Sequence, residues 1–575
     1  MDSLVSQPPL LERIAPWLEG GALAMLVMVV VSLGGEAVLT SYHGYLHSAI
    51  GEAVLRDGLL PENPYHAGSD LQYYLLYPVL GVLLGRLGGG PLWGFAILNI
   101  FAAALMGPAL DALGKRFGLD FRARRFAFAA MVLGFNGLGW LYMMLAAGDP
   151  LPEGAMPLVA LMDSTRPFEG MHWDGRLQSF LPKFLNVSSF ALALPFALFS
   201  MSENLREGRT ALWRCAALLG VTTAVNPLVG LFVGLLVVAR KLPRLREGAA
   251  ALKELLPAAL LALLIAVPFL LPVLFASLER DPQAASPQLP FEGVAWANLL
   301  GPLLLLVLAA VFALRRMHQN RNHLLLAIGI VVLFSFSSLP WGNEYKFPRI
   351  AGILLAIPAG FLLGSWSKRL PGGLAAGACL LLCLPMTWQT VKVYSAWGHG
   401  SSYLLDHVED GRLAARESAR TKGWPEAVEI AERNLPADAV LMIHPRHPDV
   451  SGGKMGAQGN QLAPILHHAL LVDSPQIHNS DLADLKARLD ACVGFWESRR
   501  WHANGRKETA AYSSAEALAA ARGFNPTRPL ALVTLELTEM PEPAYQLKAA
   551  GGTLLARENG VEMWLLPPLS AAAGN

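Results

Sequence analysis

The chain has 575 residues, of which 53% are hydrophobic and 15% are charged, and its formal net charge is +1. This composition is much more apolar than that of soluble proteins and indicates a membrane protein, while the small net charge gives no reason to expect a nucleic-acid partner. The four cysteines are too few and too scattered for a disulfide framework or a zinc site, so we interpret them as packing residues.

The apolar runs predict an α-helical polytopic protein. The first twenty residues carry three acids against one arginine, unlike a cleaved signal peptide, so the first run should remain as a span. A span needs about 20 mostly apolar residues, and about 11 crossings fit the chain if the long run at 211–240 breaks at Asn226-Pro227. The candidate runs are 19–36, 91–113, 126–147, 187–205, 211–240, 255–278, 296–314, 323–340, 349–366 and 373–393, with 72–89 ambiguous.

The basic residues between these runs predict the orientation of the chain, because short cytoplasmic loops hold the excess of lysine and arginine. The loops 148–186, 279–295 and 341–348, and the chain after about residue 394, are then external. The acidic stretch Glu36–Asp70 has Arg56 as its one basic residue and should also be external, which leaves 72–89 as an interfacial or re-entrant helix. The alternative is an external amino terminus with 72–89 spanning, which would put this acidic stretch in the cytoplasm. The basic clusters are Lys115–Arg125, Arg206–Arg214, Arg240–Arg246, Arg315–Arg321 and Lys368–Arg369.

In the first external loop, apolar residues recur every three or four positions over 42–54 and predict an amphipathic helix at the membrane surface. His43 and His47 share one face of it, either as a metal pair or as interfacial polar residues. The turn-rich stretch Leu60–Asp70, with two prolines and a glycine, predicts a stiff path for the backbone.

Two later external loops combine acids with cations. The second contains Asp163, Asp174, Arg176 and Lys183, a set that could clamp a phosphate and supply a base, or form ordinary salt bridges. The third runs from Trp341 to Arg349 and contains Glu344, Lys346 and Arg349. Positive charge on the external side goes against the bias of the other loops, so we expect a ligand or an acidic partner to hold Lys346 and Arg349.

After Trp388 the long apolar runs give way to helical patterns that alternate with short β-type runs. We therefore predict that residues 396–575 form a soluble external α/β domain. We therefore expect four parts, namely 1–36 (amino terminus and first span), 37–90 (first external loop), 91–395 (transmembrane helical module) and 396–575. The elements expected in the last part are helices at Pro425–Asn434 and Leu482–Leu489, strands at Ala439–His444, Ala469–Val472 and Leu530–Leu535, and a hairpin of Thr553–Ala556 with Val561–Leu566.

This layout resembles the GT-C class of membrane glycosyltransferases, which includes oligosaccharyltransferases, protein mannosyltransferases and aminoarabinose transferases. The likeness rests on one span before an acidic first external loop, the basic turn Ala112-Leu-Gly-Lys-Arg-Phe-Gly, the following Arg124-Arg-Phe-Ala-Phe-Ala-Ala, an acidic second loop and a closing soluble domain. The resemblance implies transfer of a sugar from a polyprenyl-phosphate donor to a glycan, lipid or protein acceptor on the outer face of a bacterial plasma membrane.

The resemblance also implies roles for residues. Glu36, or less favourably Asp57 or Asp70, would be the first acid, as base or as ligand of a divalent metal ion, and Asp163 or Asp174 the second. Lys346 and Arg349 would hold the carrier phosphate. The class has an acid where Ser41-Tyr42-His43 stands here, so either Glu36 or His43 takes its place or the chain has the fold without the activity.

Two further functions stay open from the sequence. A transporter or flippase of a lipid-linked or anionic solute would need broken helices, internal repeats and paired charges deep in the membrane. A non-catalytic membrane scaffold would use its external domain to bind a partner protein. The sequence shows no internal repeat and few charges deep within the spans, which counts against a transporter.

Overall fold

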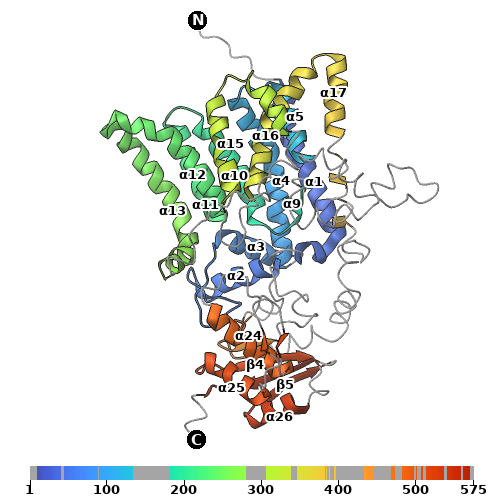
Figure 1. The fold of residues 1–575 in the computed structure, drawn as a ribbon, viewed down its shortest axis with the longest axis vertical. Helices are drawn as coiled ribbons and strands as arrows, with labels where there is room; N and C mark the ends of the chain where they lie inside the picture. The colour runs from blue at the N-terminus through green and yellow to red at the C-terminus, as the bar shows by residue number, and fades with distance from the viewer. Residues whose placement is uncertain are drawn as a thin grey trace, which may run out of the picture. The chain divides into compact units, whose positions relative to one another are not determined.

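In the computed structural model, the chain forms two compact units (Figure 1). The helical unit comprises Met1–Leu39, Ala96–Pro268 and Asp281–Leu404, and the sheet unit comprises Thr40–Phe95, Phe269–Arg280 and Leu405–Asn575. The sheet unit thus joins the predicted first external loop to the C-terminal part of the chain. The structure describes positions 9–40, 44–88, 90–133, 181–279, 306–337, 346–381, 384, 387–388, 391, 394–395, 433–443, 468–472, 482–497, 500–501, 507–508, 513–535, 541–558 and 561–569.

Among the residues described, four helical stretches are long and apolar enough to cross a membrane: Leu10–Gly34, Leu92–Arg116, Ala249–Phe275 and Lys346–Trp366. The chain is therefore an integral membrane protein, and the predicted number of crossings stays a prediction. The labelled helices that lie wholly or mainly in the helical unit are α1 (Leu10–Thr40), α4 (Pro91–Arg116), α5 (Phe121–Val132), α9 (Pro182–Leu185), α10 (Ser189–Asn204), α11 (Arg209–Val225), α12 (Pro227–Lys241), α13 (Ala249–Glu279), α15 (Arg321–Ser335), α16 (Lys346–Trp366) and α17 (Leu370–Leu381).

The predicted break at Asn226-Pro227 is confirmed, since α11 ends at Val225 and α12 begins at Pro227. Proline fits the first helical position because its missing N–H would have no intrahelical partner there. The Asn226 side chain caps α12 by accepting from the Val229 N–H at 3.3 Å and donates to Ser189 Oγ at 3.0 Å. One residue therefore ends one helix, starts the next and ties both to α10.

Close contact between α5 and α16 depends on two glycines. A Cβ at Gly360 would lie 2.5 Å from the carbonyl oxygen of Ala123, and one at Gly364 would lie 2.7 Å from the Ala123 Cα. This spacing of four residues is the small-xxx-small pattern that lets membrane helices approach closely. It fixes α16, whose first turn carries Lys346 and Arg349, against α5.

A buried ion cluster joins α1, α4 and α5. Asp111 accepts from Arg124 Nε at 2.7 Å and from Lys115 Nζ at 2.9 Å, and it also pairs with Arg125. Arg124 also forms an ion pair with Glu12, with 2.5 Å between Arg124 Nη2 and Glu12 Oε1. Part of the basic cluster Lys115–Arg125, which we used to orient the chain, is thus neutralised inside the fold and stabilises helix packing.

The sheet unit contains a four-stranded mixed sheet in the order β1-β4-β6-β5. Strand β1 pairs in parallel with β4, and β6 pairs antiparallel with both β4 and β5. The bounds are β1 (Val440–Ile443), β4 (Leu530–Leu535), β5 (Thr553–Glu558) and β6 (Val561–Leu566), with a separate pair β2 (Arg500–Trp501) and β3 (Lys507–Glu508). The predicted strand Leu530–Leu535 and the terminal hairpin are confirmed, while an extracytoplasmic C-terminal domain stays a prediction.

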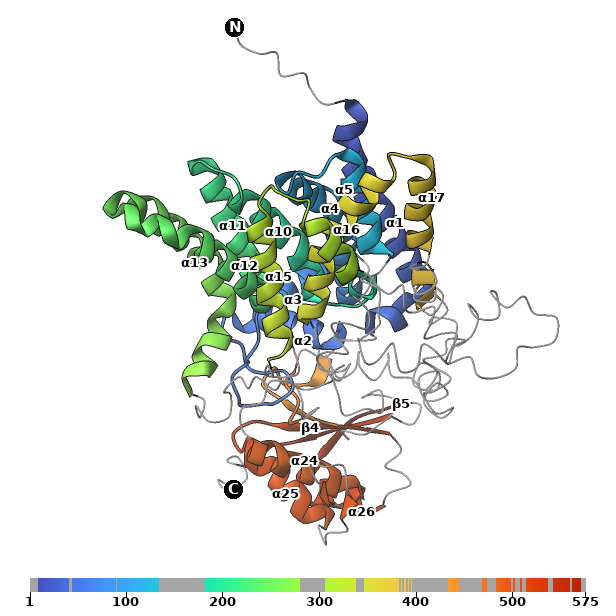
Figure 2. The ribbon, with the colours of Figure 1, turned by 45° about the horizontal axis from the view of Figure 1, so that its top comes forward.

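The two faces of this sheet are covered by different parts of the chain, since successive strand residues point to opposite sides. Val440, Leu532 and Trp564 pack with residues of the helices α24 (Leu482–Glu497), α25 (Ser514–Phe524) and α26 (Pro541–Ala549), which lie together on one side of the sheet (Figure 2). On the other face, Leu441 and Val533 pack with residues of the first loop and of α2 (Gly44–Asp57). The C-terminal sheet therefore buries both faces only with the help of the first loop.

The amphipathic helix predicted near 42–54 is confirmed as α2, which packs on α3 (Leu76–Arg86). The buried Glu52 pairs with Arg86 at 2.6 Å across these two helices. Helix α3 has 11 residues. At 1.5 Å per residue it extends about 16 Å, roughly half of a bilayer core. This length agrees with a segment 72–89 that does not cross the membrane.

Candidate anion-binding site

Lys183 is a buried charged residue of the helical unit, with 5% of its surface exposed. It lies in the short helix α9, beside Phe184 and Leu185, which are fully buried and anchor the backbone. Asn99 of α4 donates from Nδ2 to the carbonyl oxygen of Asn186 at 2.6 Å, and this hydrogen bond ties the segment to α4. A lysine is almost never buried unless a charged or polar group faces it.

Lys346 and Arg349 lie in the first turn of α16, which corrects the prediction that the loop from Trp341 continues to Arg349. Pro348 is compatible with this turn, because its missing N–H has no intrahelical partner to lose near the start of a helix. Residues three apart share one face of a helix, so the two cations lie on the same side. Phe347 is buried and stacks on Phe334 of α15 with 5.0 Å between ring centroids, which fixes this turn.

The three cations interact with one another. Burial lowers the pKa of Lys183 well below its ordinary value of 10.5, and the positive charges of Arg349 and Lys346 lower it further. The helical unit thus brings one cation of the predicted second external loop to two cations of the predicted third. The N-terminal end of α16 adds the partial positive charge of its backbone N–H groups.

Such an arrangement is suited to an anion with several oxygens. Arginine and lysine hold phosphate through charge-assisted hydrogen bonds, which are stronger than those between neutral groups. Three cations and a helix N-terminus can balance the charge of a phosphate or pyrophosphate group. In a partly buried place the attraction is less weakened by water than at a surface.

The remaining predicted residues are placed as follows. Asp163, Asp174, Arg176, Glu344 and His43 lie outside the described residues. The backbone of Glu36 is helical within α1.

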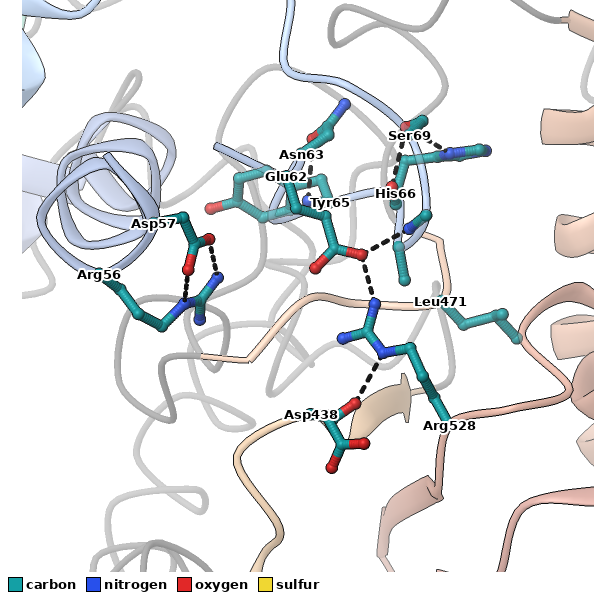
Figure 3. Close-up of polar contacts among 12 residues, drawn as sticks. Arg56, Asp57, Glu62, Asn63, Tyr65, His66, Ser69, Asp438, Leu471 and Arg528 are labelled. Atoms are coloured by element: carbon teal, nitrogen blue, oxygen red, sulfur yellow. Dashed lines mark hydrogen bonds and ion pairs between the residues drawn. The ribbon is translucent and has the colours of Figure 1, made fainter. Parts of the chain in front are cut away.

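His47 and Asp70 belong to the sheet unit. His47 is buried among aromatic rings, with its ring centroid 5.0 Å from Tyr77 and 5.5 Å from Tyr73. Asp70 is exposed and forms an isolated antiparallel bridge with Glu62. Asp57 forms an ion pair with its neighbour Arg56 at 2.7 Å (Figure 3). The described residues contain no group of three histidines, cysteines or acids that could hold a metal ion, so the expected divalent metal has no ligands assigned among them.

Asn99 is the residue of this site that the sequence reasoning missed. It is the one strongly polar side chain in the middle of the apolar run 91–113, and it is buried. A buried amide in a spanning helix needs a partner, and this requirement was the signal that could have identified it.

These features together define an integral membrane protein with a cluster of three cations, of which Lys183 is buried, at the start of one of its long apolar helices. The chain is similar to two crystal structures of ArnT from Cupriavidus metallidurans, one in the apo state and one bound to undecaprenyl phosphate. Both are 15% identical to this chain and cover 95% of it, with 98% of their own length matched, at TM-scores of 0.48 and 0.49. ArnT is a GT-C glycosyltransferase, the class that the sequence resembles.

No protein-family model matches the chain, and no curated protein matches it. Because the identity to ArnT is low, we transfer no residue role from these structures. The roles proposed below rest on the residues of this chain.

Proposed function

We propose that the protein is a membrane glycosyltransferase that moves a sugar from a polyprenyl-phosphate-linked donor to an acceptor on the outer face of the membrane. The observation that carries this proposal is that the buried Lys183 lies within electrostatic range of Lys346 and Arg349, which share the first turn of α16. A donor of this kind has a phosphate at the membrane surface and an isoprenoid tail in the lipid. The cation cluster can bind the phosphate of such a donor, and the apolar helix that begins at the cluster lies in the lipid that holds the isoprenoid tail.

In this proposal the cations act on the leaving group. The acceptor oxygen forms a bond to the anomeric carbon of the sugar while the bond from that carbon to the phosphate oxygen breaks. The electron pair of the broken bond goes to the phosphate, where Lys183, Lys346 and Arg349 stabilise the added negative charge. A carboxylate takes the proton of the acceptor. Glu36, Asp163 and Asp174 remain our candidates for this acid, and a divalent metal ion beside it stays open.

Direct binding tests the cluster. The protein in lipid nanodiscs is titrated with undecaprenyl phosphate, the ligand named for one of the similar structures. We expect Lys346→Ala and Arg349→Ala each to weaken binding ten- to a hundredfold, since a hydrogen bond to a charged group contributes about 1.5–3 kcal/mol. Lys368→Ala is the matched control, because Lys368 is exposed and pairs with Asp120 at 3.2 Å.

Transfer is tested with a radiolabelled polyprenyl-phosphate sugar and membrane acceptors. Covalent product in wild type, lost in Lys346→Ala while the protein still inserts, supports the proposal. Uptake of the labelled lipid into proteoliposomes without any covalent product would overturn it in favour of a transporter. Binding equal to wild type in both α16 variants would overturn the roles of Lys346 and Arg349.

A further inference from the structure

His323 of α15 is a buried histidine with an unsatisfied ring nitrogen. It is 8% exposed, and its Nε2 has no hydrogen-bond partner among the residues that the structure describes. It lies in the first turn of α15, and Asn320, just before this turn, donates from Nδ2 to the Arg116 carbonyl at 2.7 Å. This hydrogen bond ties the start of α15 to the end of α4. A buried polar atom without a partner is rare in proteins, so a group that binds to the chain at this place is its natural partner.

Two cations lie within electrostatic range of His323. They are Arg240 and Lys241, the last two residues of α12, which packs against α15 (Figure 1). Both side chains are half-buried, and neither forms an ion pair within the part of the chain that the structure describes. We call these two cations and His323 the α12–α15 cluster.

The acid nearest in charge to this cluster is already bonded elsewhere. Glu254 of α13 lies within electrostatic range of Lys241, but it accepts from Arg244 at 2.7 Å. The two positive charges of the α12–α15 cluster are therefore not balanced by the described residues. A negatively charged oxygen would balance them and could also accept a hydrogen bond from the Nε2–H tautomer of His323.

The α12–α15 cluster is distinct from the cluster that contains Lys346. The ring of Phe334, at the other end of α15, stacks on Phe347, which follows Lys346 in α16. The rise of 1.5 Å per residue separates His323 from Phe334 by about 16 Å along the helix. One phosphate group cannot contact both clusters.

An exposed apolar face begins beside His323 and follows α15. Leu325, Leu326 and Leu333 are 45%, 40% and 53% exposed. Leu326 and Leu333 lie on one side of the helix, because seven residues make about two turns. In an integral membrane protein such a face contacts the hydrocarbon chains of lipids. An anionic group with hydrocarbon chains would therefore match both the cations and this face, whereas a free phosphate ion would match the cations alone.

We propose that Arg240, Lys241 and His323 bind the headgroup of an anionic phospholipid whose hydrocarbon chains lie along α15. The phosphate oxygen accepts from His323 Nε2, and the two cations balance its charge. Basic pockets between membrane helices bind such headgroups. A zwitterionic headgroup fits less well, because its ammonium group would need an acid and Glu254 is paired. This inference is independent of the proposed function, since it concerns the opposite end of α15 from Lys346.

The test measures lipid binding to the full-length protein. The protein in detergent is titrated with phosphatidylglycerol and, separately, with the zwitterionic phosphatidylcholine, and native mass spectrometry gives the dissociation constant of each lipid. Lys241→Met removes the charge, and His323→Phe removes the ring nitrogens while a ring stays in place. Arg209→Met is the matched control. Arg209 is exposed at the start of α11, four residues after Leu205, whose carbonyl accepts from Arg240 at 3.5 Å, so it is a cation at the same end of the helices.

We expect wild type and Arg209→Met to bind phosphatidylglycerol at least tenfold more tightly than phosphatidylcholine, as one charge-assisted hydrogen bond allows. This preference should disappear in Lys241→Met and in His323→Phe, and Lys241→Arg should keep it. The same preference in wild type and Lys241→Met would overturn the site, and this comparison decides even if His323→Phe does not fold. An equal loss in Arg209→Met would show a general effect of charge and would also overturn it. Inorganic phosphate that displaces phosphatidylglycerol at equal concentration would identify a site for a free anion and overturn the assignment to a lipid.

Discussion

The lowered pKa of Lys183 predicts that anion binding at the cation cluster takes up a proton. Above its lowered pKa the free protein holds Lys183 as a neutral amine, and a bound phosphate supplies the negative charge that restores its proton. Affinity should then fall as pH rises through the window between that lowered pKa and the pKa of the complex. One proton corresponds to at most a tenfold change per pH unit, about 1.4 kcal/mol.

The assay is calorimetric titration with undecaprenyl phosphate above about pH 7.5, where the phosphate has already lost its second proton, whose pKa is about 6. Repeating the titration in buffers with different ionisation enthalpies gives the number of protons taken up. Lys183→Met keeps the length of the side chain and should abolish both the proton uptake and the slope. A slope of zero in wild type, or the same slope in wild type and Lys183→Met, would refute this reasoning.

The lowered pKa of Lys183 also predicts the direction in which the stability of the protein changes with pH. Where the folded pKa of lysine is lowered, the unfolded chain holds more protons between that value and 10.5, so stability rises with pH across this window and gains nothing below it. Chemical denaturation of the ligand-free protein should therefore show stability increasing toward pH 10, and Lys183→Met should flatten the increase. A fall in stability over this window that Lys183→Met removes would contradict the direction of the shift.

Three substitutions test the packing that positions these parts. Gly364→Leu should destabilise the helical unit by about 1–3 kcal/mol, because its Cβ would meet the Ala123 backbone at 2.7 Å, and a thermal unfolding scan in detergent checks this. Asp111→Asn leaves three cations around a neutral amide and should cost about 3–5 kcal/mol, and an unchanged melting temperature would contradict the network. Gly68→Ala should cost more than Gly58→Ala: both have positive φ, at 82° and 90°, but only a Gly68 Cβ would meet Asn525 Oδ1, at 2.9 Å. Equal melting temperatures for these two variants would show that the Asn525 contact has no effect.

Local signals in the sequence predicted the local structure well. Asn226-Pro227 marked a helix break because asparagine caps a helix and proline begins one, and both effects act within a few residues. The apolar run predicts a span that begins at residue 349, whereas Lys346 is already helical, since Lys346 and Arg349 interrupt the apolar run without interrupting the helix. Helix ends are set by backbone hydrogen bonds, which hydropathy does not report.

Contacts between distant segments were harder to predict. The charge bias indicated that Lys183 and the two α16 cations lie on the same side of the membrane, but it carried no information on their distance. The pairing of Ala67 with Leu470 was not predicted, because neither segment has a sequence pattern that identifies the segment with which it pairs. The strands of the C-terminal sheet were recognised from their composition, while the layer that covers their second face comes from the first loop.

That covering layer has a consequence for how the protein is made. Ala67 and Arg488 are 421 positions apart in the chain. At about 5–20 residues per second, about 20 to 80 s pass between the synthesis of the first loop and the synthesis of Arg488, which bonds to it. During this time the apolar face of α2, with Leu46 and Ile50, has no sheet to pack against. The membrane surface or a chaperone must shield it, so a nascent chain stalled before residue 440 should expose this face to protease or to lipid.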